Sequence, residues 1–253
     1  MNTKQATLFL ILFGITTMGF AQNNLNSDRP GLSYSASTLP SGSLQYQGGI
    51  HLNSARWAYP TLNVFRTDQG LRYGISDKFE VDARVSWERS TFPELNSVYS
   101  GLHGVQIMAR YQFLNAEQSG IDLSVLASYE GLNDILIDSD IIDIVRIRAA
   151  ASKTLAEKLL VNVNAGLSFN DNGQPKTGYL YAANFAYFLG QKTSVFAEVN
   201  GETINGNREN FYHGGFTFQP SNKLLFDASA GFKSSSWLGD AGYFSFGATY
   251  RII

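Results

Sequence analysis

The chain has 253 residues, and its 19 Lys and Arg against 21 Asp and Glu give a formal net charge of −2. This slightly acidic balance makes nucleic acid an unfavourable partner. The sequence has no Cys, which excludes a disulfide framework, a lipidated N-terminal Cys and thiolate metal sites. Its 24 Gly, 13 Tyr and 18 Phe against only 6 Pro favour a chain rich in strands and turns over a helical or disordered one.

Residues 1–21 have the pattern of a secretory signal peptide. Lys4 supplies a positive charge, an apolar core follows, and Gly19 and Ala21 are the small residues that precede a cleavage site. The apolar core is too short to span a bilayer as a helix, which takes about 20 residues, and no later stretch comes near that length. A buried N-terminal helix fits these flanks less well. We therefore expect export and cleavage after Ala21.

Residues 22–42 are polar and carry Pro30 and Pro40, so we expect an irregular N-terminal segment on the periplasmic side. Its length also allows it to fold back into the lumen of a barrel as a plug, which is a hypothesis based on its position and polarity. The remaining residues, 43–253, make up the predicted barrel.

From Leu44 onward, apolar and polar residues alternate with the period of two that is typical of strands with unlike faces. Between Phe79 and Glu88, for example, every second residue is charged or hydroxylated and the others are apolar. The same pattern predicts twelve strands, at about residues 44–52, 66–75, 79–88, 105–113, 121–130, 142–154, 159–169, 178–189, 193–202, 210–219, 224–234 and 242–252.

The predicted connections alternate in length. Five are short, at residues 76–78, 115–120, 156–158, 190–192 and 220–223, and six are long, at about 53–65, 90–102, 131–141, 170–177, 203–209 and 235–241. Outer-membrane barrels have short periplasmic turns and longer outer loops. The sequence therefore predicts an all-β fold, a single up-and-down antiparallel transmembrane β-barrel of about twelve strands with both chain ends on the short-turn side.

A soluble β-sandwich is the alternative, because it also alternates in this way. Three features favour the barrel: strands of about 9 to 11 residues, a strongly charged polar face, and aromatic residues near both ends of the strands. The aromatic residues expected near the long loops are Trp87, Tyr129, Phe169, Tyr179, Tyr181, Trp237 and Tyr243, and those near the short turns are Tyr73, Phe79, Tyr111, Phe113, Tyr187, Phe188, Phe226 and Tyr250.

If the apolar face meets lipid, the charged residues of the other face line the lumen, because a charge facing the middle of the bilayer costs about 2–4 kcal/mol for Arg or Lys. Seven of these residues are acidic and seven basic, which indicates cross-strand ion pairing. They either brace the interior or contact a passing solute, and the sequence leaves both roles open. The candidate lumen-facing residues are Arg72, Glu80, Asp82, Arg84, Glu88, Arg110, Asp122, Glu130, Arg146, Arg148, Glu198, Asp227, Lys233 and Arg251.

The sequence offers residues for two other kinds of site. An acidic loop with Asp134, Asp138, Asp140 and Asp143 could collect a divalent cation, but it lacks the Gly of a calcium-binding loop, so a solvated loop is the default. A hydrolase would need a Ser activated by a positioned His. The three histidines, His51, His103 and His213, are not spaced in that way. We expect no catalytic residue, no cofactor and no metal, and therefore no enzyme.

Two motifs, Ser27-Asp28-Arg29-Pro30 and Leu71-Arg72-Tyr73-Gly74-Ile75-Ser76-Asp77-Lys78-Phe79-Glu80-Val81, resemble a family of bacterial outer-membrane barrels described as transporters or components of a phenol-degradation meta-pathway. The likeness is greatest to members from Bacteroidota. It implies uptake of small, aromatic or hydrophobic compounds. The chain departs from the usual pattern at its end, because barrel precursors commonly finish on an aromatic residue and this one finishes on Ile253.

The leading functional hypothesis is a porin-like channel or transporter for small solutes in the outer membrane of a Gram-negative cell. The first alternative is a non-conducting barrel that braces the membrane or presents its loops, and the second is an outer-membrane enzyme. The expected partners are outer-membrane lipid, the outer-membrane assembly machinery and a small-molecule solute.

Overall fold

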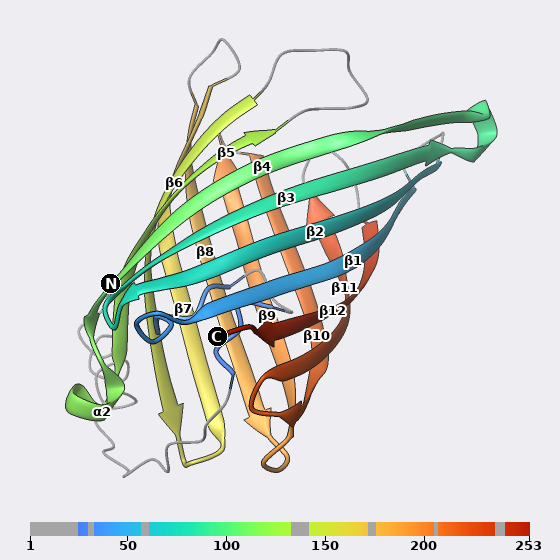
Figure 1. Cartoon of the computed structure of the whole chain (residues 1–253). Helices are drawn as coiled ribbons and strands as arrows, with labels where there is room; N and C mark the ends of the chain where they lie inside the picture. The colour runs from blue at the N-terminus through green and yellow to red at the C-terminus, as the bar shows by residue number, and fades with distance from the viewer. Residues whose placement is uncertain are drawn as a thin grey trace, which may run out of the picture.

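A computed structural model describes residues 25–29, 33–56, 61–132, 142–171, 176–204, 207–235 and 241–253, so the predicted signal peptide lies outside the described residues. Within these residues, twelve antiparallel strands form a closed barrel (Figure 1). Each strand pairs with its neighbours along the chain, and β1 pairs with β12 to close the ring. The predicted all-β, up-and-down barrel is therefore confirmed.

The strands follow one another with little else between them. Their bounds are β1 Leu44–Arg56, β2 Thr61–Ser76, β3 Phe79–Phe92, β4 Ser97–Leu114, β5 Asp122–Leu132, β6 Ile142–Leu155, β7 Leu159–Asp171, β8 Lys176–Phe188, β9 Thr193–Ile204, β10 Asn207–Ser221, β11 Leu224–Ser235 and β12 Ala241–Arg251. Two short helices complete the described structure, η1 at Pro93–Leu95 and α2 at Ala116–Ser119.

Several strands are longer than predicted. The connections expected at about 53–65 and 203–209 are shorter than that, and the long loop expected at residues 90–102 was wrong. β3 continues to Phe92 and pairs there with Ser97 at the start of β4, leaving only a tight turn that contains η1. Arg89, Ser90 and Thr91 are all polar, so the apolar–polar alternation of the sequence stops at Glu88, whereas the backbone ladder continues. Figure 1 shows this β3–β4 hairpin projecting beyond its neighbours at the upper right.

The opposite end of the barrel carries the short turns. In the β4–β5 turn, the side chain of Asn115 accepts a hydrogen bond from the backbone N–H of Glu117 and begins α2, and Gly120 ends it with φ of 74°. The β6–β7 turn is tighter, because Ala156 and Glu157 both have positive φ, at 49° and 61°. Positive φ at two consecutive residues of the three-residue connection, 156–158, gives a turn whose twist matches that of the strands that it joins.

The barrel has a polar interior and an apolar exterior, which is the reverse of a water-soluble protein. Arg72, Glu80 and Arg110 are fully buried inside, whereas Ile107 and Phe232 are 57% and 53% exposed on the outside. Within the part of the chain that the structure describes, no helix is long and apolar enough to cross a membrane. The predicted alternation between a polar interior and an apolar exterior is thus present along the strands.

Two aromatic residues, Phe188 and Tyr243, were assigned to the wrong face. Phe188 pairs with the buried Ser194 and lines the interior with it, while its neighbour Tyr187 is 46% exposed. The ring of Tyr243 lies 5.6 Å from that of His213, on the inward face that also carries Ser245, while its neighbour Phe244 is 46% exposed. Consecutive strand residues point to opposite sides, so Tyr243 cannot share an outer aromatic band with Phe244. Trp237, placed in the same band, lies outside the described residues.

Candidate functional site in the barrel interior

The described part of the chain before β1, residues 25–29 and 33–43, is called here the N-terminal segment. It runs inside the barrel, because it is hydrogen-bonded or ion-paired to side chains on strands β1 to β7 and β9 to β12, which surround it (Figure 1). These side chains are Gln45, Gln47, Arg72, Glu80, Arg84, Arg110, Gln112, Asp122, Ser152, Asn164, Glu198, Gln219, Asp227, Ser245 and Thr249.

Asp28 is the centre of the largest charge cluster. Its carboxylate accepts a 2.7 Å hydrogen bond from Arg110 and lies 3.6 Å from Arg72 and 3.7 Å from Arg84. These arginines belong to three neighbouring strands, β2, β3 and β4. Burial alone would raise the pKa of Asp28, but the arginines, Arg110 foremost, outweigh it and hold the pKa below its ordinary value of 3.8. Asp28 is therefore a stable anion that ties the segment to this wall.

The next residue ties the segment to the opposite side of the barrel seam. Arg29 donates from Nε and Nη2 to the two carboxylate oxygens of Asp227 on β11, each at 3.2 Å, and from Nη2 to Ser245 on β12 at 3.1 Å. Its guanidinium fits where Gly49 and Gly247 face each other in the β1–β12 ladder. A Cβ at either glycine would lie only 2.2–2.3 Å from guanidinium atoms of Arg29. The two glycines thus leave the space that the guanidinium fills.

The second half of the segment is fixed by backbone and apolar contacts. Glu198 on β9 accepts hydrogen bonds from Ser33, at 3.0 Å from the backbone N–H and 2.6 Å from the hydroxyl. Tyr34 exchanges two backbone hydrogen bonds with the amide of Asn164. Ala36 is fully buried in a small apolar cluster, whose other members are Met108, Leu126 and Ala150 on β4, β5 and β6.

The predicted lumen-facing charges fall into two groups. Seven of them bind the N-terminal segment: Arg72, Glu80, Arg84, Arg110, Asp122, Glu198 and Asp227. The others lie apart from it or touch it through a ring. Asp82 pairs with Arg84, Glu130 with Arg146, Lys233 with Glu209 and Glu88 with His103, the guanidinium of Arg148 lies 4.8 Å from the Tyr34 ring centroid, and the backbone N–H of Arg251 donates to Lys223.

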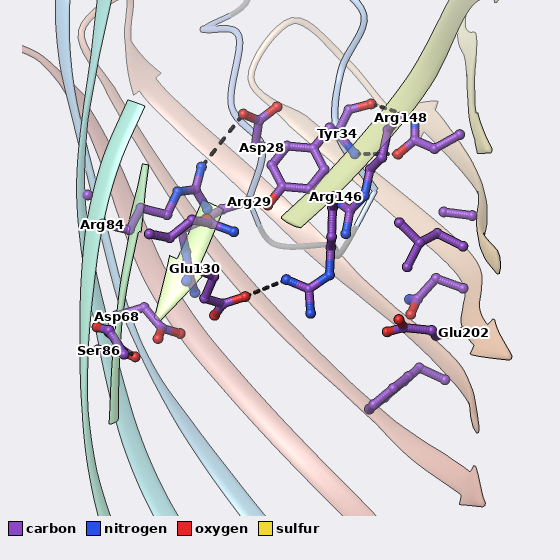
Figure 2. A pocket seen from close by; sticks show the side chains of 18 of the residues that line it. Asp28, Arg29, Tyr34, Asp68, Arg84, Ser86, Glu130, Arg146, Arg148 and Glu202 are labelled. Atoms are coloured by element: carbon purple, nitrogen blue, oxygen red, sulfur yellow. Dashed lines mark hydrogen bonds and ion pairs between the residues drawn. The ribbon is translucent and has the colours of Figure 1, made fainter. Parts of the chain in front are cut away.

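The segment separates two cavities inside the barrel. The first, of about 310 Å³, lies toward the long-connection end and is drawn in Figure 2. The second, of about 1480 Å³, is lined by residues of the short turns, such as Asp77 and Gln191. Asp28 and Arg29 are the lining residues common to both. The two residues with the strongest ionic contacts to the wall therefore stand at the boundary between the cavities.

The histidines each lie next to a carboxylate. The Nε2 atom of His51 is 2.6 Å from Asp68, and that of His213 is 2.9 Å from Glu198. The Nε2 atom of His213 also lies 3.2 Å from the side-chain amide of Asn200, so the described contacts of this nitrogen are to a carboxylate and an amide. This geometry favours histidines that belong to the charge network.

The acidic loop is mostly beyond what the structure describes, because Asp134, Asp138 and Asp140 lie outside the described residues. The remaining member, Asp143, accepts a hydrogen bond from the hydroxyl of Tyr129 at 2.5 Å. Among the described residues, no group of three or more His, Asp and Glu is arranged to hold a metal ion.

The sequence analysis did not single out Asp28, Arg29 and Tyr34 as site residues. Asp28 and Arg29 appeared only within the motif that carries the family resemblance, although they are the only described charges of an otherwise uncharged segment. That contrast is a signal that could have marked them. The apolar residues Leu126 and Ala150 at inward positions of β5 and β6 gave a second signal, since they interrupt a polar face.

No protein-family model matches the sequence, and no curated protein matches it closely enough to count as a relative. Solved structures are similar in fold. The COG4313 outer membrane channel from Pseudomonas putida F1 has a TM-score of 0.70 at 13% identity, covering 89% of this chain and all of that one. The KdgM porin in complex with disordered oligogalacturonate has a TM-score of 0.56 at 12% identity, covering 80% of this chain and 98% of that one. The CymD monoaromatic hydrocarbon channel has a TM-score of 0.53 at 10% identity, covering 84% of this chain and 89% of that one.

These likenesses define the class of fold, which is that of outer-membrane channel barrels. They agree with the barrel that the family resemblance implied. The phenol-degradation label and the Bacteroidota type stay predictions.

Proposed function

We propose that the protein is an outer-membrane channel for small solutes that the N-terminal segment holds closed. The observation that carries the proposal is the pair of cavities, about 310 and 1480 Å³, with the segment between them. A barrel of twelve strands is wider than the eight-stranded kind that side chains can fill. Removal of the segment would therefore join the two cavities into a polar path along the barrel axis.

The surface of the barrel supports a place in the membrane. Leaving apolar area in water costs roughly 25 cal/mol per Å², so an exterior of exposed Ile, Leu, Val, Phe and Tyr side chains is stable only against an apolar medium. The strands are 11 to 18 residues long, which is enough to cross the hydrocarbon layer when tilted. We accordingly propose outer-membrane lipid and the outer-membrane assembly machinery as partners.

The solute class that we propose is small and includes an aromatic or hydrophobic part. The rings of Tyr34 and Phe211 line the first cavity among its charged residues. The likeness to a channel for monoaromatic hydrocarbons is in keeping with such a solute. The charges around the rings favour a solute that also carries polar groups.

The absence of cysteine from the chain allows a direct test of the closed state. The hydroxyls of Ser27 in the segment and Thr249 on β12 lie 2.8 Å apart, so cysteines at both positions are close enough to form a disulfide. We expect the Ser27→Cys/Thr249→Cys variant to conduct ions in planar bilayers only when the disulfide is reduced. The single Ser27→Cys variant is the matched control and should not respond to the reductant.

Equal conductance of the oxidised and reduced double variant would contradict a segment that moves. A second function, a non-conducting barrel, is favoured by the number of strands that the segment binds. It would be supported if neither the reduced double variant nor a chain lacking residues 25–42 conducts ions or allows solute-dependent swelling of liposomes.

A further inference from the structure

Almost all of the charged side chains that line the first cavity form an ion pair with an oppositely charged side chain of the protein. Arg29 pairs with Asp227, Arg84 with Asp82, Arg146 with Glu130, Glu209 with Lys233, and Asp68 with both Arg66 and His51. Asp28 pairs with Arg110. Charges that are paired in this way have little capacity left for a ligand.

Arg148 and Glu202 are different. Within the described residues, neither has an oppositely charged group at ion-pair distance, although both line this cavity. Arg148 on β6 contacts the ring of Tyr34, and its Nε is buried without a hydrogen-bond partner. Glu202 on β9 accepts a hydrogen bond from the hydroxyl of Ser168. The cavity thus offers one open cation and one open anion.

The two open charges face a common space. Figure 2 shows Arg148 next to the Tyr34 ring and Glu202 on another wall of the pocket. Their charges attract each other, yet they form no ion pair. A buried charge without an oppositely charged partner is costly. A ligand that carries both charges can pair with Arg148 and Glu202 at once, and it therefore stabilises this space more than water does.

We propose that this cavity binds a small zwitterionic solute, with its carboxylate at Arg148 and its ammonium group at Glu202. The planar guanidinium of an arginine matches a carboxylate through two parallel hydrogen bonds, and a carboxylate accepts hydrogen bonds from an ammonium. The rings of Tyr34 and Phe211 in the same lining suit an apolar or aromatic side chain. An aromatic amino acid combines these three features.

This inference deepens the proposed function and rests on it in one respect, since the bound solute is taken to be one that the channel passes. The cavity volume of about 310 Å³ suits one such molecule rather than a polymer. Because the site is closed on one side by Tyr34 of the N-terminal segment, a solute bound there lies directly on the segment.

The test measures binding to the full chain in detergent by calorimetry with three probes. These are phenylalanine, 3-phenylpropionate, which lacks the ammonium, and 2-phenylethylamine, which lacks the carboxylate. We expect phenylalanine to bind at least about ten-fold more tightly than either analogue, as charge-assisted hydrogen bonds give. Weaker selectivity, or no binding of any probe, would overturn the proposal.

Two variants assign the groups. Glu202→Gln should remove the preference for phenylalanine over 3-phenylpropionate, whereas Arg148→Gln should weaken both and leave 2-phenylethylamine unaffected. Retained binding of one probe shows that each variant is folded. The controls, Glu117→Gln on α2 and Lys158→Gln in the β6–β7 turn, remove exposed charges outside this cavity and should bind like the unaltered chain. An equal loss for all probes in either cavity variant counts against the assignment.

The outcomes separate the site from the channel. Selective binding by a protein that conducts no ions would keep the zwitterion site and reject the proposed channel. Conductance that depends on the segment, with no selective binding, would keep the channel and reject the site.

Discussion

Arg29 and Asp227 are separated by 198 positions in the sequence, yet the guanidinium of the first donates two hydrogen bonds to the carboxylate of the second. The carboxylate of Asp227 is completely buried and the guanidinium of Arg29 is 9% exposed. This pair joins the N-terminal segment to β11, across the β1–β12 seam from the arginines that hold Asp28. Loss of the pair should therefore loosen the segment without disturbing the strand ladder.

Asp227→Asn should increase the open probability of single channels. The substitution leaves the Arg29 charge buried without its partner, and breaking a buried pair in this way costs roughly 3–5 kcal/mol. Glu209→Gln is the matched control, because it breaks the pair with Lys233 at the long-connection end, away from the segment. An unchanged closed state in Asp227→Asn, or equal opening in both variants, would show that this pair does not hold the segment.

Gly247→Ala should open the channel by a steric clash with Arg29, without removing a charge. The new methyl carbon would lie 2.3 Å from Nε of Arg29, so the guanidinium must move away from Asp227. Gly242→Ala lies on the same strand, where the nearest atom would be 4.0 Å away, and should have no effect. Gel mobility of unheated and heated samples would check that both variants fold as barrels.

The contacts of Asp28 with its arginines should be insensitive to mild acid. Asp28 lies in the segment, outside the strands, and its lowered pKa means that its ionised form is favoured in the folded protein. Its contribution is complete above the ordinary value of 3.8 and is lost as the pH falls below that value. We expect the difference in conductance between the Asp28→Asn variant and the unaltered chain to be constant between about pH 7 and pH 5 and to disappear below about pH 4. A loss of this difference already at about pH 5 would contradict the prediction.

Glu157→Gly should stabilise the barrel. Glu157 has φ of 61° in the β6–β7 turn, and a residue other than glycine in this conformation costs on the order of 1 kcal/mol. The substitution should raise the free energy of unfolding in urea by about that amount. Lys158→Gly, at the neighbouring position without positive φ, should lower it or leave it unchanged.

The sequence predicted the fold well because membrane-type strands have two unlike faces, which a period of two records directly. It predicted the ends of strands poorly. The β3–β4 hairpin runs past Glu88 to Phe92. Apolar and polar residues no longer alternate there, because Arg89, Ser90 and Thr91 are all polar, so the sequence does not mark the continued backbone pairing.

The contacts of the segment could not be predicted because they depend on strand register. Asp28 meets arginines on three strands, and their convergence follows from cross-strand pairs such as Arg72 with Asp82 and Glu80 with Arg110. A shift of one residue would send these side chains to the outside. The same dependence applies to Arg148 and Glu202, since only the assembled barrel shows which charges remain without partners.

The wall contacts of the segment also bear on the order in which the protein assembles. The segment precedes β1 in the chain, yet Arg29 and Ser27 bind side chains on β11 and β12, the last strands of the sequence. Gly247 contributes its half of the Arg29 site only after β12 has paired with β1. The segment therefore acquires its full set of contacts after the ring is complete, and its docking would serve as a reporter of barrel closure during biogenesis.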